Sequence, residues 1–264
     1  MNKLLPKPSK VIDFQRETFD NFTITLDAKM KHEPGQFVQV SLLGFGEAPI
    51  SIASHSDKYI KLNIHEVGNV TNALAKLKKG DKVFIKGPYG KGYPMKKLKG
   101  NDIIIIGGGC GVAPLKGVID YIGQNRSNYN NVMLFLGFRT PDDILFNKEL
   151  KKWRKDYHVN VSVDKDPKKT CYDFNVGFIT EMLEKTDLNN NNKVVFLCGP
   201  PIMINKVIEI LKNKGFNDNQ MFVSNERLMF CGIGMCCHCM IRGKLTCLDG
   251  PVFRYDEINK YEND

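Results

Sequence analysis

The sequence contains no long apolar run. Its most apolar stretch, IIIIGGGCGVAPL, is short and broken by glycine, whereas a membrane-spanning helix needs about 18 or more apolar residues. The opening residues, MNKLLPKPSK, have neither the apolar centre nor the small-residue cleavage site of a signal peptide. We therefore expect a cytoplasmic protein that makes no use of a membrane.

Motifs for binding nucleic acid are also absent. The formal net charge is +9, but the sequence has no zinc-finger or RRM motif, and its lysines are scattered instead of concentrated on one element. The excess of positive charge indicates a solvated, lysine-rich surface, or attraction to an acidic partner or an anionic nucleotide. We expect no nucleic-acid partner.

Residues 1–98 lack helical periodicity almost throughout. Short β-branched or alternating segments, such as FDNFTITLDA, GQFVQVSLLG and YIKLNIHEV, are separated by Gly, Pro, Asp and Asn. About six such strands at this spacing predict a six-stranded antiparallel barrel. The exception is NVTNALAKLK, which predicts a helix over residues 69–78 with Val70, Leu74 and Leu77 on one face.

Residues 99–222 show a different pattern. Apolar runs such as DIIIIGGG, VMLFLGFR and KVVFLCGPP alternate with segments of helical periodicity. The predicted helices span residues 114–125, 143–157, 177–185 and 203–215. This alternation predicts a doubly wound parallel sheet with helices on both faces. Residues 223–264 have little periodic pattern and form a third, small segment that carries most of the cysteines.

Glycines gather where the first apolar run of this second region ends. Gly107, Gly108, Gly109 and Gly111 lie between a predicted buried strand and a predicted helix. Glycine allows a sharp turn and close approach of a ligand, and the unpaired N–H groups at a helix start favour an anion. The loop is a candidate site for a nucleotide pyrophosphate. It lacks the strict G-x-G-x-x-G spacing, and tight strand–helix packing is the alternative explanation.

A second candidate loop follows the apolar run KVVFL. Cys198, Gly199 and Pro200, within CGPPIM, form a rigid turn after a predicted strand. The turn could form the wall against which a nicotinamide ring lies, or it could simply end the strand. Both loops are expected at the carboxyl edge of the sheet, where open α/β sheets bind ligands.

Five of the eight cysteines lie within residues 231–247. Cys231, Cys236, Cys239 and Cys247 are spaced C-x4-C-x2-C-x7-C, with glycines that let the loop curl around a compact object. Disulfides are disfavoured in a reducing cytoplasm, and structural zinc sites prefer paired C-x2-C units. The spacing favours a [2Fe–2S] cluster, because plant-type ferredoxins open with the same C-x4-C-x2-C run. Cys237 falls outside the pattern and is interpreted as a non-ligand.

Several motifs resemble one known family. CGIGMCCHC followed by CLDGPVF, together with NERLMFCGIG, RTPDDILF and EAPISI, is similar to the ferredoxin–NADP reductase superfamily, in its branch with a C-terminal [2Fe–2S] segment. The resemblance covers residues 5–255. The branch includes electron-transfer subunits of dihydroorotate dehydrogenase, gamma subunits of hydrogenases and B subunits of anaerobic sulfite reductase, and the motifs most resemble the last of these.

The resemblance implies an FAD site on the barrel. The positions that correspond to the family's two flavin motifs are Ala48, Pro49, Ile50, Ser51, His65, Glu66, Val67, Gly68 and Thr71. The arginine usual in the first motif is absent, because Glu47 and Ala48 stand there. A positive group for the flavin pyrophosphate must then come from elsewhere, and the start of the following helix is a candidate.

The resemblance also implies that the glycine loop and the CGPP turn bind NADH or NADPH, with Cys198 positioning the nicotinamide. Asp164 favours NADH because it would repel a 2′-phosphate, whereas Arg139 and three nearby lysines favour NADPH. Glu226 and Arg227 would lie where the cluster segment meets the flavin.

The expected function is an electron relay from NAD(P)H through FAD and the [2Fe–2S] cluster to a catalytic reductase subunit, with anaerobic sulfite reductase as the favoured enzyme. A ferredoxin-like subunit is a further candidate partner, and no side chain is expected to act as an acid or a base. Two alternatives remain open. One is the same module serving dihydroorotate dehydrogenase or a hydrogenase, and the other is a zinc-stabilised binding module without enzymatic activity.

Overall fold

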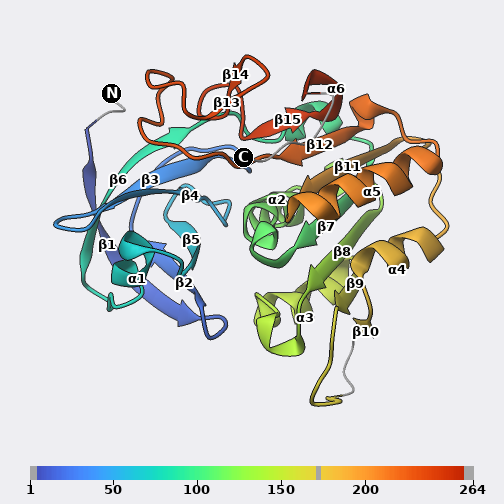
Figure 1. The fold of residues 1–264 in the computed structure, drawn as a ribbon, viewed down its shortest axis with the longest axis horizontal. Helices are drawn as coiled ribbons and strands as arrows, with labels where there is room; N and C mark the ends of the chain where they lie inside the picture. Colours follow the sequence, from blue (N-terminus) through green and yellow to red (C-terminus); the bar gives the residue numbers. More distant parts are fainter. Residues whose placement is uncertain (1–4, 171–173, 259–264) are drawn as a thin grey trace.

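The chain forms two lobes with a C-terminal segment that lies across both of them (Figure 1). The computed structural model describes residues 5–170 and 174–258. Within these ranges no helix combines the length and the apolar character needed to cross a membrane.

The first lobe is an antiparallel β-barrel. Its elements are β1 (Lys7–Arg16), β2 (Asn21–Leu26), β3 (Phe37–Leu42), β4 (Gly46–Ser51), β5 (Ile60–His65), α1 (Asn69–Leu74) and β6 (Lys82–Tyr89). The strands follow the order β4-β3-β6-β1-β2-β5, and an antiparallel bridge between Ile52 and Leu62 links the two outer strands. The predicted six-stranded barrel is confirmed.

The predicted helix over residues 69–78 is correct only in its first part. α1 ends at Leu74, and the N–H groups of Lys76 and Leu77 bond to carbonyl groups three residues earlier, at 3.2 Å each. This tighter turn ends the helix before Gly80 reverses the chain at a φ of +101°. Leu77 still packs against the barrel core, together with Val70, so the apolar face was identified correctly although the helix is shorter.

The second lobe is built on a seven-stranded sheet. Its elements are β7 (Asp102–Gly108), α2 (Val112–Gln124), β8 (Val132–Phe138), α3 (Asn147–Asp156), β9 (His158–Val163), β10 (Asn175–Val176), α4 (Ile179–Lys185), β11 (Lys193–Cys198), α5 (Pro201–Asn213), β12 (Met221–Ser224), β15 (Val252–Arg254) and α6 (Tyr255–Ile258). The order is β10-β9-β8-β7-β11-β12-β15. All neighbours are parallel except β12 and β15.

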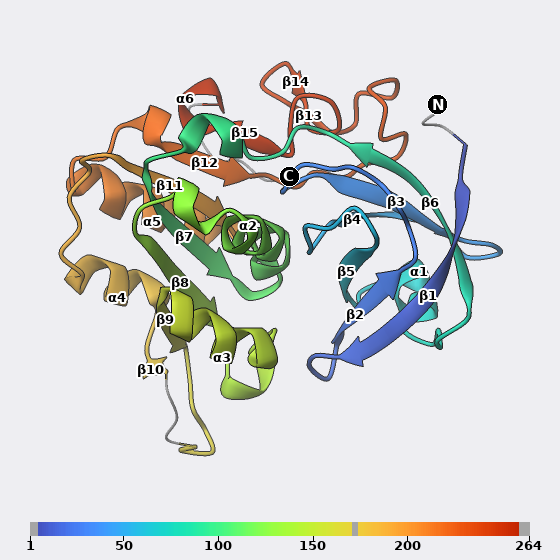
Figure 2. The same ribbon diagram turned by 180° about the vertical axis from the view of Figure 1, so that it is seen from behind.

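The four isoleucines of β7 explain why this strand is an unbroken apolar run. Ile103 and Ile105 face the core that α2 and α3 cover. Ile104 and Ile106 face the opposite core, which α4 and α5 cover. Because successive side chains of a strand point to opposite faces, a strand covered on both sides needs apolar residues at every position. The predicted doubly wound sheet is confirmed (Figure 2).

The predicted helix over residues 143–157 begins later than expected. α3 starts at Asn147, and the preceding Phe146 has a left-handed φ of +59°. The three residues before the helix are buried in the core of this lobe: Ile144, Leu145 and Phe146. They pack in the core as part of the connector that leads into α3. Periodicity alone does not separate such a buried connector from a first helical turn.

The C-terminal segment is shared between the lobes. It contains the hairpin of β13 (Met240–Ile241) and β14 (Lys244–Leu245), which lies over β3 and β6 in both views (Figures 1 and 2). β15 then joins the sheet of the second lobe beside β12. The sheet of the second lobe therefore contains strands from both sides of residue 222. The domain boundaries after residues 98 and 222 stay predictions.

Candidate functional site

A cavity of about 650 Å³ lies where the two lobes meet. Thr18, Asp20, Asn21 and His65 line it from the barrel, and the loops that follow the parallel strands line it from the second lobe. The strand order reverses between β7 and β11, which is where open α/β sheets bind ligands. The sequence analysis missed Thr18, Asp20 and Asn21, because the turn between β1 and β2 and the first residue of β2 carry no motif.

The glycine loop forms one wall of this cavity. Gly108, Gly109 and Gly111 line it, whereas Gly107 is buried within β7 and does not. A Cβ at Gly107 would lie 3.0 Å from Leu115 of α2, so this glycine serves strand–helix packing. Gly109 has a φ of +53°, and a Cβ there would meet nothing within 4 Å. Its backbone is therefore open to a ligand.

The glycine loop also packs directly against the CGPP turn. A Cβ at Gly111 would lie 2.6 Å from the backbone carbonyl of Cys198 and 2.6 Å from the nitrogen of Gly199. Cys198, Gly199 and Pro200 line the cavity from the other side of this contact. The structure therefore brings the two predicted nucleotide loops together, and the close approach requires glycine at residue 111.

Two thiols and a carboxyl group lie close together in one part of the cavity. Burial, with a further contribution from the charge of Glu226, raises the pKa of Cys198, whereas a hydrogen bond with Ser224 lowers it. Burial likewise raises the pKa of Cys110, whose sulfur accepts a hydrogen bond from Asn21 Nδ2 at 3.5 Å. Both thiols are therefore neutral near pH 7 and do not act as nucleophiles.

Glu226 faces the same part of the cavity from the start of the cluster segment. Its surface opens into the cavity, and the protein around it raises the pKa of its carboxyl group through burial. The neighbouring Arg227 points elsewhere, because its guanidinium donates to the carbonyl of Met240 at 3.2 Å. Of these two predicted residues, only Glu226 lies in the cavity.

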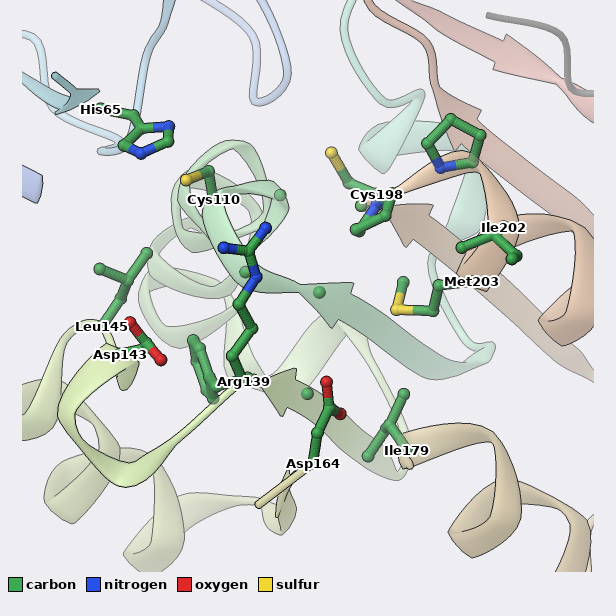
Figure 3. Close-up of a pocket in the computed structure, with 18 of the residues that line it drawn as sticks. His65, Cys110, Arg139, Asp143, Leu145, Asp164, Ile179, Cys198, Ile202 and Met203 are labelled. Atoms are coloured by element: carbon green, nitrogen blue, oxygen red, sulfur yellow. The ribbon is translucent and has the colours of Figure 1, made fainter. Parts of the chain in front are cut away.

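Another part of the cavity carries opposite charges. Arg139 and Asp164 both line it, from the ends of β8 and β9 (Figure 3). Burial raises the pKa of Asp164, although the positive charges of Arg139 and Lys165 oppose this shift. Lys168 does not line the cavity and pairs with the exposed Asp142 at 2.5 Å. The structure thus brings Arg139 and Asp164 together and separates Lys168 from them.

The first predicted flavin motif lies on β4. Ala48, Pro49, Ile50 and Ser51 are half-buried, in contrast to the fully buried β2. Glu47, which stands beside the missing arginine, accepts from Lys86 Nζ at 2.7 Å and from Ser41 Oγ at 2.6 Å. The carboxylate is therefore neutralised by the lysine.

The second predicted flavin motif forms the loop before α1. His65 pairs with Asp20 at 3.0 Å and lines the cavity, whereas Glu66 pairs with Arg16. The Thr71 hydroxyl accepts from the N–H groups of Val67 and Gly68, each at 3.0 Å.

These two motifs present an accessible surface. A Cβ at Gly68 would meet nothing within 4 Å, and the side chain of Val67 is 70% exposed. The half-buried face of β4 is the other part of this surface. The residues present therefore fit a flavin, and the cations beside the two motifs, Arg16 and Lys86, are paired with Glu66 and Glu47.

The four spaced cysteines form a compact group. Cys231 accepts hydrogen bonds from the backbone nitrogens of Met235 and Cys236 at 3.3 and 3.4 Å, and Cys247 accepts one from Gly234 at 3.2 Å. Gly234 has a φ of +79°, and a Cβ there would lie 2.3 Å from Leu248. The glycine-rich loop thus directs N–H donors at the sulfur atoms.

The four thiols affect one another's pKa values. Hydrogen bonds to the backbone near His238 and Cys231, and to the Cys231 thiol, lower the pKa of Cys236 to about 7. Burial and interaction with the Cys239 thiol raise the pKa of Cys247 to about 12. In the described ranges no three His, Cys, Asp or Glu side chains surround a single ion position. Four cysteine thiolates are the usual donor set of an iron–sulfur cluster, so the chemistry of these residues fits one.

Cys237 differs from these four cysteines. It is exposed and has a left-handed φ of +59°, whereas Cys239 and Cys247 are 2% and 0% exposed. The buried pair packs against Phe37 of β3 and Tyr89 of β6. The cysteine group therefore lies on the barrel, beside the strand that carries the first flavin motif.

A barrel, a doubly wound nucleotide-binding sheet and a segment of four grouped thiols together define a reductase-like protein of the electron-transfer class. Residues 105–209 match the family model of the oxidoreductase NAD-binding domain. Residues 226–259 match that of the iron–sulfur cluster binding domain of dihydroorotate dehydrogenase B. The chain belongs to the family of ferredoxin reductase-like electron-transfer subunits that carry this iron–sulfur domain.

Two curated relatives come from Pyrococcus furiosus. Sulfhydrogenase 1 subunit gamma is 38% identical over 244 residues, which cover 88% of this chain and 82% of that protein. A probable dihydroorotate dehydrogenase B (NAD(+)) electron transfer subunit is 35% identical and covers 86% of this chain and 82% of that protein. Neither is a sulfite reductase subunit, so these relatives do not support that finer assignment.

Solved structures show the same fold. The NADH-dependent reduced ferredoxin–NADP oxidoreductase superposes with a TM-score of 0.77 at 23% identity, covering 96% of this chain and 92% of that chain. A ferredoxin NADP⁺ reductase from Neisseria gonorrhoeae, with bound FAD and NADP, gives 0.71 at 18% identity and covers 83% and 98%. The ferredoxin reductase-like architecture is therefore established for both lobes.

Proposed function

We propose that this chain is the electron-input subunit of a larger reductase, binding NADH, FAD and a [2Fe–2S] cluster. One observation carries the proposal. The four-thiol segment packs on β3 and β6 of the barrel, while the nucleotide cavity opens between the barrel and the second lobe. FAD and the cluster, when bound, supply the conversion of a two-electron hydride into single electrons.

The chain's own residues hold and orient the reactants. The open backbone at Gly109 provides N–H groups for the pyrophosphate, and the neutral thiol of Cys198 forms an uncharged wall for the nicotinamide. Glu226 places a carboxyl group in the same part of the cavity as Cys198. None of these steps needs proton transfer by a side chain, so catalysis depends on positioning.

Asp164 is expected to make the chain prefer NADH. Its carboxylate lines the cavity, where it would repel the 2′-phosphate of NADPH. Replacing it with asparagine removes the charge and retains the size. The ratio of kcat/KM for NADH over NADPH should fall by about ten-fold in Asp164→Asn, measured by dye reduction.

The matched control for this variant is Asp156→Asn. Asp156 is the last residue of α3 and does not line the cavity. Its replacement should leave the ratio unchanged. Equal ratios in the wild type and in Asp164→Asn would show that Asp164 does not select the nucleotide.

The proposed partner is the catalytic subunit that receives the electrons. Leu228, Phe230, Met235 and Leu248 expose 63%, 56%, 78% and 47% of their surface on the cluster segment. Exposed apolar groups that gather on one segment indicate a contact with another protein. The names of the relatives favour a hydrogenase or a dihydroorotate dehydrogenase subunit as this partner over a sulfite reductase subunit.

Co-purification under anoxic conditions tests the proposed partner. A tagged form of the chain, isolated from its native cells without oxygen, should bring down a catalytic oxidoreductase subunit in about equal amount. Identifying that subunit distinguishes the hydrogenase, dihydroorotate dehydrogenase and sulfite reductase assignments. Isolation of the chain alone, with its cofactors intact, would count against a stable complex.

A further inference from the structure

Gln39 is a buried polar residue that the proposed function does not yet use. It lies on β3 and is 1% exposed. Within the described part of the chain its side-chain oxygen, Oε1, is buried and has no hydrogen-bond partner. Leaving a buried amide group unsatisfied costs about 1–3 kcal/mol. Burying this glutamine therefore lowers stability, which indicates that its side chain serves a function other than packing.

The side chain of Gln39 contacts the loop that carries the cysteines. A Cβ at Gly232 would lie 3.3 Å from Gln39 Nε2, 3.5 Å from Gln39 Cγ and 3.5 Å from Tyr89 Cε2. Gly232 directly follows Cys231 in the chain. A negative charge on Cys231 also contributes to the raised pKa of Tyr89, after burial and the charge of Glu47. Gln39 and Tyr89 thus lie against the residue that follows the first cysteine.

The backbone of Gln39 also reaches the strand of the first flavin motif. In the barrel sheet Gln39 pairs with Pro49 of β4 on one side and with Lys86 of β6 on the other. Pro49 belongs to the first flavin motif. Gln39 therefore contacts both β4, which is expected to bind the flavin, and the loop at Gly232, which is expected to bind the iron.

We infer that the side-chain amide of Gln39 donates an N–H hydrogen bond to the sulfur atoms of the cluster near Cys231 and so raises its reduction potential. Of the two ends of the amide, Nε2 is the one near the cysteine loop, 3.3 Å from a Cβ placed at Gly232, so the donor end of the side chain faces this loop. Sulfur carrying negative charge accepts hydrogen bonds, and donors of this kind stabilise the reduced cluster, which holds one more electron. The inference rests on the proposed cluster and adds a positioning residue from the barrel.

The test is a redox titration of Gln39→Met, purified without oxygen and followed by electron paramagnetic resonance. Methionine retains the length of glutamine but has no N–H group. We expect unchanged iron content and a cluster that is harder to reduce. At a fixed solution potential the ratio of reduced to oxidised cluster should fall about ten-fold, which corresponds to about 59 mV for a one-electron couple.

Gln124→Met is the matched control. Gln124 ends α2 and donates to the carbonyl of His55 at 2.7 Å, where it contacts the barrel but no cysteine. Its replacement should leave the potential unchanged. A wild-type potential in Gln39→Met with full iron content would overturn the role of Gln39 and leave the proposed function intact, whereas a wild type without iron would overturn the proposed function itself.

A second measurement keeps the inference testable if Gln39→Met does not assemble its cluster. Wild-type protein labelled with ¹⁵N in its glutamine side chains should show a nitrogen hyperfine coupling to the reduced cluster in pulsed electron paramagnetic resonance. A hydrogen bond to cluster sulfur transmits unpaired spin to the donor nitrogen. Absence of the coupling in a fully loaded sample would contradict the inference.

Discussion

Replacing Cys239 with serine is expected to remove the iron from the purified protein. Cys239 is 2% exposed and packs with Cys247, Phe37 and Tyr89, so its sulfur faces the interior of the cysteine group. A serine hydroxyl is a poorer ligand than a thiolate for iron in a cluster. Loss of one of four ligands should lower the iron content at least about ten-fold, measured by metal analysis after anoxic purification.

Cys237→Ser is the control that makes this result specific. Cys237 is separated from Cys239 by one residue but is exposed and has a φ of +59°. Its replacement should leave both iron content and visible absorbance unchanged. If Cys237→Ser loses iron and Cys239→Ser retains it, the assignment of the ligands is wrong. One zinc in place of iron in the wild type would favour a structural metal site.

The second large effect is expected at Gly111. A Cβ there would lie 2.6 Å from the backbone of Cys198 and Gly199, and backbone atoms cannot rotate away as a side chain can. Gly111→Ala should push the two nucleotide loops apart, at a cost of about 1–3 kcal/mol. Since both loops line the cavity, the Kd for NADH should rise about ten-fold, while the iron content stays unchanged. Calorimetry or fluorescence titration measures the Kd.

Gly123→Ala, in the helix that directly follows Gly111, provides the comparison. Gly123 lies near the end of α2, and a Cβ there would meet only the Tyr157 hydroxyl, at 3.3 Å. Alanine also favours helix over glycine by about 1 kcal/mol. This variant should bind NADH as the wild type does. An unchanged Kd in Gly111→Ala would show that the contact between the loops does not shape the nucleotide site.

The sequence predicted those parts of the fold that follow from local pattern. The unbroken run of Ile103, Ile104, Ile105 and Ile106 predicts a strand covered on both faces, and the sheet confirms it. The start of α3 was placed too early because the buried residues 144–146 carry the same apolar signal as a helix face. β1 carries a weak strand signal, since its only buried residues are Ser9 and Val11.

The candidate site was predictable only where one segment carries its own motif. The glycine loop and the CGPP turn lie together at the cavity, as their places after two strands suggested. Thr18, Asp20 and Asn21 complete the cavity from the other lobe, but no local pattern reports a contact between lobes. Gln39 was missed for the same reason. Its contact with Gly232 joins two segments that are far apart in the sequence, and no local pattern predicts it.

The central claim is that one chain passes electrons from a nicotinamide nucleotide through a flavin to iron. Anoxic titration of the purified protein with NADH, followed by visible absorbance and electron paramagnetic resonance, tests it most directly. We expect the flavin absorbance to bleach and the resonance of a reduced [2Fe–2S] cluster to appear, with uptake of about three electrons per chain. Bleaching of the flavin with no resonance from iron, even at excess NADH, would contradict the account.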